Sequence, residues 1–166
     1  IRAIGFLTRQ HIGHLDNDLP LALGAETFLT GVLVFHAEDM PIWAFDFNLT
    51  AGEITNKRVF VDLSGQSGRP DGATVDAEGY LWNAEYGGSR VVRYTPDGKY
   101  DQQVDLPVTN VTCCAFGGLD FSTLFITTAA QNLTAAELEN QPLAGGLFAC
   151  DLDIRGLPEP YFADKN

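Results

Sequence analysis

Few residues of this 166-residue chain combine the type and the spacing that chemistry requires. The acidic residue Asp71 stands in the tripeptide Pro70-Asp71-Gly72, just before a segment with strand character. A carboxylate offers oxygen ligands to a hard cation, and it can accept a proton from water. The same tripeptide is a common turn sequence, and on its own it favours the turn over a ligand.

The other candidates for chemistry are weaker. The pair His11 and His14 has the spacing of two metal ligands, but no third ligand follows at a meaningful distance, which favours chance. The segment 65–68 is not a nucleophile elbow, and the sequence has no glycine-rich phosphate or dinucleotide loop. We therefore do not expect covalent serine catalysis or nucleotide chemistry. The second Pro-Asp-Gly tripeptide, at 96–98, is interpreted as a turn only.

The overall charge excludes one class of partner. The net charge is −12 and the pI is about 4.4, whereas binding to nucleic acid phosphates needs a basic surface. The hydrophobic content of 45% indicates a folded chain rather than a disordered one. No apolar run reaches the roughly eighteen residues of a membrane span. We expect neither nucleic acid nor a membrane as a partner.

The cysteines point to a compartment. Cys113, Cys114 and Cys150 are odd in number and two are adjacent, so they do not form a disulfide framework, and their spacing matches no zinc pattern. We interpret them as buried thiols in strands of a protein in a reducing cytosol. Residues 1–7 are too short and too lightly charged for a signal peptide. These observations predict a cytoplasmic protein.

The stretch 69–94 predicts the elements that would position Asp71. Aromatic and β-branched residues alternate between Gly and Asp turns, which indicates strands over 73–76, 80–85 and 90–94, and a fourth strand follows over 100–106. Four consecutive antiparallel strands in about forty residues have the size of one propeller blade.

The same pattern recurs on both sides. We expect strands over 33–38, 42–47, 57–63, 111–116, 123–128, 146–151 and 159–163, a turn over 49–56, and a helical turn or two over 134–139, where a capping box begins at Thr134. Asp46, Thr95 and Asp151 occupy equivalent places, 49 and 56 residues apart. Periods near fifty residues with four strands each indicate blades.

The predicted fold is therefore all-β: a β-propeller of about three four-stranded blades, the first without a clear inner strand. Residues 1–30 form a divergent segment and residues 31–166 a single, incomplete domain. Three blades do not close a ring, since propellers typically have four to eight. We expect either a missing half or a second chain to complete it, with self-association covering the open strand edges.

Side-chain alternation assigns further roles. Laying the third blade on the second places Thr112 where Asp71 falls, and we interpret Thr112 as a strand hydroxyl bonded to the backbone. His36, Asn83 and Glu85 alternate on second strands, away from the axis, with structural or surface roles. The aromatic stripe Trp43, Phe45 and Phe47 is interpreted as packing between blades.

The sequence resembles a known family over the segments 42–63, 69–99, 106–129 and 141–163. Its marks are a Pro-Asp-Gly strand start, a Cys-Cys-x-Phe-Gly-Gly turn and an Ala-Gly-Gly-Leu-Phe strand, in that order. Together they are similar to the C-terminal half of the senescence marker protein/regucalcin/gluconolactonase family, whose members are six-bladed propellers and metal-dependent sugar lactonases. The resemblance implies half of such a propeller.

The resemblance also implies a role for Asp71. In that family a divalent cation at the mouth of the channel is held by a Glu near the N-terminus, the Asn of a Ser-Asn-Gly motif and the Asp of Pro-Asp-Gly. Only the last carries over, onto Asp71, as metal ligand and catalytic base. The Ser-Asn-Gly motif is absent, the neighbours of Asn17 do not match it, and residues 1–30 depart from the family altogether. The implied cofactor is calcium or zinc, with magnesium or manganese as alternatives.

Two functions remain open at this point. The first is a gluconolactonase-like, metal-dependent hydrolase of a small sugar lactone, or a truncated relative of one. The second is a non-catalytic half-propeller that acts only through assembly, or an inactive gene fragment. The presence of one family ligand out of three favours the second for this chain by itself.

Overall fold

The computed structural model describes residues 31–34, 40–48, 51 and 53–158. Within them the chain is built almost entirely of strands. The elements are β1 (Gly31–Val34), β2 (Pro41–Asn48), β3 (Glu53–Asp62), β4 (Arg69–Val75), β5 (Leu81–Tyr86), β6 (Arg90–Tyr94), β7 (Tyr100–Asp105), β8 (Val111–Gly117), β9 (Thr123–Thr128), α1 (Ala135–Asn140) and β10 (Leu147–Asp151).

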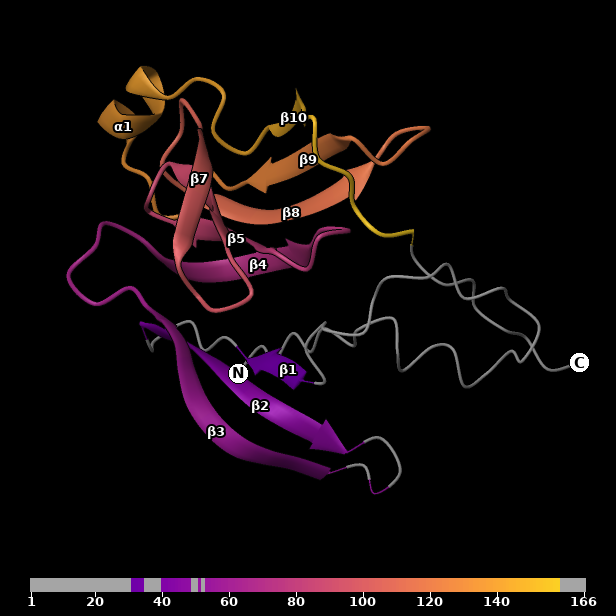
Figure 1. Cartoon of the computed structure of the whole chain (residues 1–166). Helices are drawn as coiled ribbons and strands as arrows, with labels where there is room; N and C mark the ends of the chain where they lie inside the picture. Colours follow the sequence, from indigo (N-terminus) through magenta and orange to yellow (C-terminus); the bar gives the residue numbers. More distant parts are fainter. Residues whose placement is uncertain (1–30, 35–39, 49–50, 52, 159–166) are drawn as a thin grey trace, which may run out of the picture.

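The strands form three antiparallel sheets in chain order. The first sheet has the order β1-β2-β3, the middle sheet β4-β5-β6-β7 and the third sheet β8-β9-β10. Figure 1 shows the middle sheet lying between the other two, with short connections from each sheet to the next. The prediction of an all-β fold is confirmed. The predicted strand over 159–163 lies outside the described residues, and the division at residue 30 stays a prediction.

Most predicted strands are found within two residues of their expected bounds. The strand β4 begins four residues earlier than predicted, at Arg69, and the end predicted for the first strand lies outside the described residues. The polar segment 49–56 also differs. It was expected as a turn, but β3 already begins at Glu53. Its cross-strand partner Asp46 accepts hydrogen bonds from the Asn56 amide (2.9 Å) and from Arg58 (2.7 Å). Side chains of β3 are exposed on both faces at this end, so the alternation that marks a half-buried strand is missing there.

The core lies in two layers, one on each face of the middle sheet. Leu81 and Val92 pack with the first sheet, whereas the adjacent residues Trp82 and Val91 pack with the third. This division follows from the two-residue period of a strand. The middle sheet is thus buried on both faces, which explains why β5 and β6 read as nearly continuous buried runs.

The aromatic stripe on β2 does not belong to the layer against the middle sheet. Trp43, Phe45 and Phe47 are half-buried, and Ile42 and Ala44 are the residues of β2 that enter that layer. The predicted alternation is present, and the packing of the aromatic face against another blade stays a prediction.

A buried carboxylate closes the end of the β4–β5 hairpin. Asp76 is fully buried, and its Oδ1 accepts hydrogen bonds from the backbone N–H groups of Glu78 (2.9 Å) and Tyr80 (3.0 Å). Its Oδ2 accepts from Trp82 Nε1 (2.9 Å) and Arg93 Nε (2.8 Å). All of its acceptor capacity is therefore used inside the protein, as a buried charge requires.

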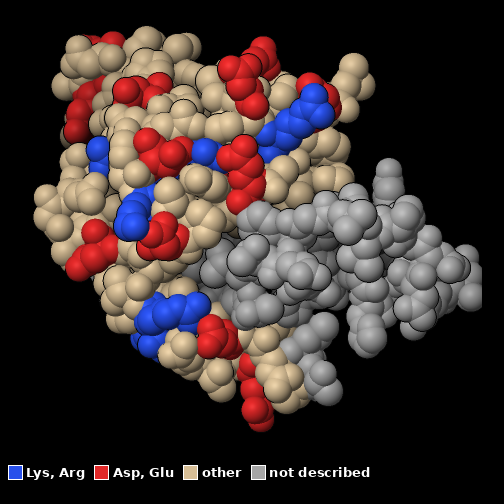
Figure 2. Space-filling model, in the orientation of Figure 1, with Lys and Arg blue, Asp and Glu red and all other residues tan. Residues whose placement is uncertain are grey.

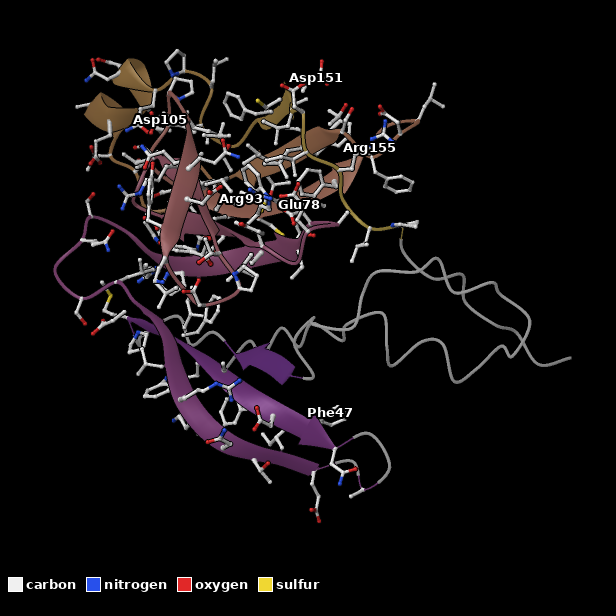
Figure 3. The ribbon with its side chains drawn as sticks, viewed as in Figure 1. Phe47, Glu78, Arg93, Asp105, Asp151 and Arg155 are labelled. Carbon is white, nitrogen blue, oxygen red and sulfur yellow. The ribbon has the colours of Figure 1, made fainter. Side chains whose placement is uncertain are left out.

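Arg93 extends this cluster across the middle sheet. Arg93 is 5% exposed, and its guanidinium contacts the carboxylates of Asp76, Glu78 and Asp101 and stacks 3.7 Å from the centre of the Tyr80 ring. Figure 3 shows Arg93 and Glu78 beside each other. Burial alone would lower the pKa of Arg93, but the hydrogen bonds that its guanidinium donates to Glu78, Asp101 and Asp76 outweigh burial and raise the pKa above its ordinary value.

The outer surface and helix α1 have conventional features. Figure 2 shows acidic and basic side chains interspersed on the face in view rather than gathered by sign. The capping box at Thr134 is confirmed: its hydroxyl accepts from Glu137 N, and the Glu137 carboxylate accepts from Thr134 N. Among the described residues, no helix has the length and apolar character needed to cross a membrane.

We predict that Asp76→Ala lowers the free energy of unfolding by about 3–5 kcal/mol, because it leaves the Arg93 charge buried and unpaired beside an unsatisfied Trp82 N–H. Urea unfolding followed by tryptophan fluorescence measures this. The matched control is Asp97→Ala, which removes an exposed carboxylate bound to Thr95 and Lys99. Equal effects of the two substitutions would contradict this account.

Candidate functional site

Asp71 lies in an irregularity of β4. Pro70 pairs with Glu85 and Ala73 with Asn83, so two residues of β4, Asp71 and Gly72, stand opposite one residue of β5. This is a β-bulge, which inserts one residue, bends the strand and re-aims the side chains beside it. Asp71 is half-buried. Bulges of this kind are over-represented next to active sites.

The first strand of the third sheet carries a matching bulge. Val111 pairs with Thr128 and Cys113 with Thr127, which leaves Thr112 as the extra residue of β8. The predicted alignment of Thr112 with Asp71 is confirmed in that both residues lie at a bulge of the first strand of their sheet. The expected partner of Thr112 is wrong, because its hydroxyl lies 2.8 Å from the Thr127 hydroxyl rather than on a backbone group.

A second buried carboxylate holds the loop that leads to Asp71. Glu85 is fully buried, and its Oε2 accepts from Arg90 Nε at 2.7 Å. Arg90 Nη2 in turn donates to Gln66 Oε1 at 2.8 Å, in the loop between β3 and β4. We call Glu85, Arg90 and Gln66 the loop clamp. It connects the β5–β6 hairpin to the loop that ends at β4, five residues before Asp71.

The same carboxylate also engages the phenol of Tyr94, which donates to Glu85 Oε1 at 3.0 Å. Burial raises the pKa of Tyr94, and the negative charge of Glu85 raises it further. Glu85 was assigned a structural or surface role; the structure places it fully in the interior, with structural partners. Its position opposite Arg90 in the hairpin was the signal for this pairing.

Asn83 is the one buried side chain of β5 whose polar atoms have no hydrogen-bond partner among the described residues. It lies on the same strand face as Leu81 and Glu85, toward the first sheet. An unsatisfied buried amide costs about 1–3 kcal/mol. A surface role for Asn83 is therefore wrong.

The structure does not place any other residue that the sequence suggested as a metal ligand beside Asp71 in the described part of the chain. The tripeptide at 96–98 is a turn, as predicted, in which Gly98 N donates to Thr95 O. His11, His14, Asn17 and His36 lie outside the described residues. Within the described part of the chain, no three His, Cys, Asp or Glu side chains are grouped so as to hold a metal ion.

The cysteines are only partly as expected. Cys114 is buried, whereas Cys150 is intermediate and Cys113 is exposed, and none forms a disulfide. Sequence reasoning did not connect Cys113 with Asp71, although the repeat places it at the position of Gly72. In the structure these two inner strands lie against each other, and Cys113 packs directly on Gly72.

Comparison with known proteins identifies the class. The family model described as SMP-30/gluconolactonase/LRE-like region matches residues 31–130, and the chain belongs to this family. Regucalcin of Agrobacterium tumefaciens, a calcium-binding protein of known structure, superposes with a TM-score of 0.75 at 30% identity, over 81% of this chain and 46% of its own. The luciferin-regenerating enzyme superposes with a TM-score of 0.70 at 25% identity, covering 78% and 44%. The three sheets are thus blades of a β-propeller, as predicted.

Individual relatives agree with this assignment. Regucalcin of Gallus gallus is 38% identical over 158 residues, which cover 93% of this chain and 52% of the relative. The 6-deoxy-6-sulfogluconolactonase of Pseudomonas putida is 44% identical over 99 residues, covering 60% and 34%. The chain spans about half the length of its relatives, or less, and its three sheets form no closed ring among the described residues.

The raised pKa of Tyr94 predicts a pH dependence. The unfolded chain loses the phenol proton near pH 10, whereas the folded chain keeps it. The contribution of Tyr94 to stability is therefore complete below about pH 10 and declines as the pH rises above it. Tyr94→Phe should show a shallower fall in unfolding free energy than wild type between roughly pH 10 and 11.5.

Urea unfolding at a series of pH values measures the two slopes. A Tyr94→Phe slope equal to wild type would show that the buried phenol does not contribute.

Proposed function

We propose that this chain carries part of the active site of a sugar-lactone hydrolase, with Asp71 as its acidic group. The observation that carries the proposal is the bulge that sets Asp71 and Gly72 apart from the regular pairing of β4. Membership of the SMP-30/gluconolactonase family supports it, as does the similarity to a relative named 6-deoxy-6-sulfogluconolactonase. The substrate class we propose is a small sugar lactone.

A divalent cation belongs to this proposal, as calcium or zinc, with magnesium or manganese as alternatives. The similarity to the Agrobacterium regucalcin, a calcium-binding protein, supports it. Asp71 fits as one oxygen ligand, but the described residues supply no complete ligand set. The proposal therefore needs ligands from outside them. When bound, such a cation polarises a carbonyl and lowers the pKa of water.

The chain's own residues have a defined task in the reaction. Water oxygen adds to the lactone carbonyl carbon, the ring C–O bond breaks, and the product is a hydroxy acid. The Asp71 carboxylate takes the proton that the water loses and returns it to the ring oxygen that leaves. The loop clamp acts through position only, since it fixes the loop that leads to β4.

We predict that Asp71→Asn lowers cation-dependent hydrolysis of gluconolactone on the order of 10²-fold or more, because it removes the base while nearly conserving the side-chain volume. The assay records acid release with calcium, with zinc and with a chelator. Asp97→Asn, the same change in the other Pro-Asp-Gly tripeptide, should keep full activity. Wild-type protein without cation-dependent turnover would refute the proposed function for this chain.

A second candidate function rests on a different observation. The face of the third sheet that points away from the middle sheet exposes Phe125 (37%) and Leu147 (67%), which stand on neighbouring strands. Apolar blade faces of this kind are normally covered. We propose, as the alternative, a non-catalytic half-propeller that acts through self-association, with a second copy of the chain over this face.

Sedimentation velocity separates the two candidates. For the assembly function we predict a dimer that becomes a monomer when Phe125 is replaced by Glu, because a buried unpaired carboxylate opposes association. Leu119→Glu, at a fully exposed turn position outside this sheet face, is the control and should leave the dimer intact. A wild-type monomer at all concentrations would exclude self-association.

We also propose a cytoplasmic location. The free thiols of Cys113, Cys114 and Cys150 support it, because such thiols persist in a reducing compartment.

A further inference from the structure

Two inner strands of the candidate site approach each other closely at Gly72 and Cys113. A Cβ added to Gly72 would lie 2.6 Å from Cys113 Cβ and 2.8 Å from Cys113 Cα, and closer still to Sγ. Real Cβ atoms do not come this near to other heavy atoms. Gly72 does not have the positive φ that would exclude a side chain by itself. The contact with Cys113, rather than backbone conformation, thus requires glycine after Asp71.

The residues on both sides of Cys113 in strand β8 are bound to neighbouring strands, so β8 does not move away from Gly72 easily. The next residue, Cys114, is 3% exposed, and its thiol lies 3.4 Å from the backbone oxygen of Trp82 in the middle sheet. The preceding residue, Thr112, is bound to Thr127 of β9. A larger side chain at position 113 would therefore push against Gly72 and the β4 bulge rather than move β8.

The electrostatics agree with close proximity to Asp71. Packing around Sγ raises the pKa of the Cys113 thiol, and the Asp71 carboxylate raises it further. One side of Cys113 is exposed to solvent.

We propose that Cys113 is a positioning residue for Asp71: the volume of the side chain at position 113 sets where the β4 bulge holds the carboxylate. The effect on catalysis rests on the proposed function, whereas the effect on the bulge does not. The residue touches neither substrate nor cation in this account. It acts through Gly72, the neighbour of Asp71 in the bulge.

Reversible enlargement of the cysteine tests the proposal in the full chain. In a Cys150→Ser background, methyl methanethiosulfonate should react with exposed Cys113 and not with buried Cys114. The thiolate attacks the sulfenyl sulfur, methanesulfinate leaves, and an S–SCH3 group forms that dithiothreitol removes. We expect the backbone ¹H–¹⁵N resonances of Asp71 and Gly72 to shift, with those of β6 and β7 unchanged.

Lactone hydrolysis by the modified protein provides the second readout. The modification should lower kcat for lactone hydrolysis at least tenfold with KM within twofold, and dithiothreitol should restore it. The unfolding midpoint should stay at the wild-type value, which separates positioning from loss of fold. Cys113→Ser, which nearly conserves the volume, should keep both the resonances and kcat.

A mutant cycle tests the contact without any activity. Gly72→Ala should lower the urea midpoint, and Cys113→Gly added to it should recover most of that loss, because it removes the atoms that the new methyl group meets. Unmoved Asp71 and Gly72 resonances after modification, or additive effects in the cycle, would overturn the proposal. If the wild-type protein does not hydrolyse the lactone, the proposed function is refuted but the positioning role of Cys113 is not. The resonance shifts and the mutant cycle test that role independently of activity.

Discussion

The buried ion pair between Asp76 and Arg93 is the interaction on which the rest of the structure depends. It joins the end of β4 to β6 through a 2.8 Å hydrogen bond, while Arg93 reaches Asp101 on β7. The backbone around Asp76 also meets the third sheet's final segment, since Ala77 N donates to Arg155 O and Asp76 bridges to Gly156. Two charges removed from water are tolerated only with such complete pairing. The pair thereby fixes the whole middle sheet and one edge of its neighbour.

Strand β4 is consequently fastened at both ends. Asp76 holds the turn between β4 and β5. The loop clamp of Gln66, Arg90 and buried Glu85 holds the loop that precedes β4. Between these points the pairing of β4 with β5 departs from regularity at the bulge, where Gly72 packs against Cys113. The place of Asp71 therefore follows from register and from packing between two inner strands, without requiring a tight turn.

How much the sequence predicted depends on the kind of interaction. Strands β5, β6 and β9 were located because apolar and aromatic residues alternate between glycine turns, and the repeat placed Thr112 on Asp71 because both begin inner strands. The polar start of β3 was missed because cross-strand pairs with Asp46 leave no hydrophobic period. The burial of Glu85 was missed because a charged residue is assigned to the surface unless its partner is known. The contact of Cys113 with Gly72 joins residues of different blades, so no local pattern encodes it.

The half-length of the chain affects the parts of the candidate site unequally. The bulge, the loop clamp and the cysteine contact are made by described residues of the middle sheet, the third sheet and the loop between β3 and β4. A divalent cation needs several oxygen ligands from different directions, and the described residues contain no group of His, Cys, Asp or Glu side chains that could hold one. The packing around Asp71 is thus present among the described residues, whereas a complete set of cation ligands is not. A fragment of a propeller can preserve the position of a functional side chain because each blade is stabilised by its immediate neighbours, but a site on the propeller axis requires contributions from blades all around the ring.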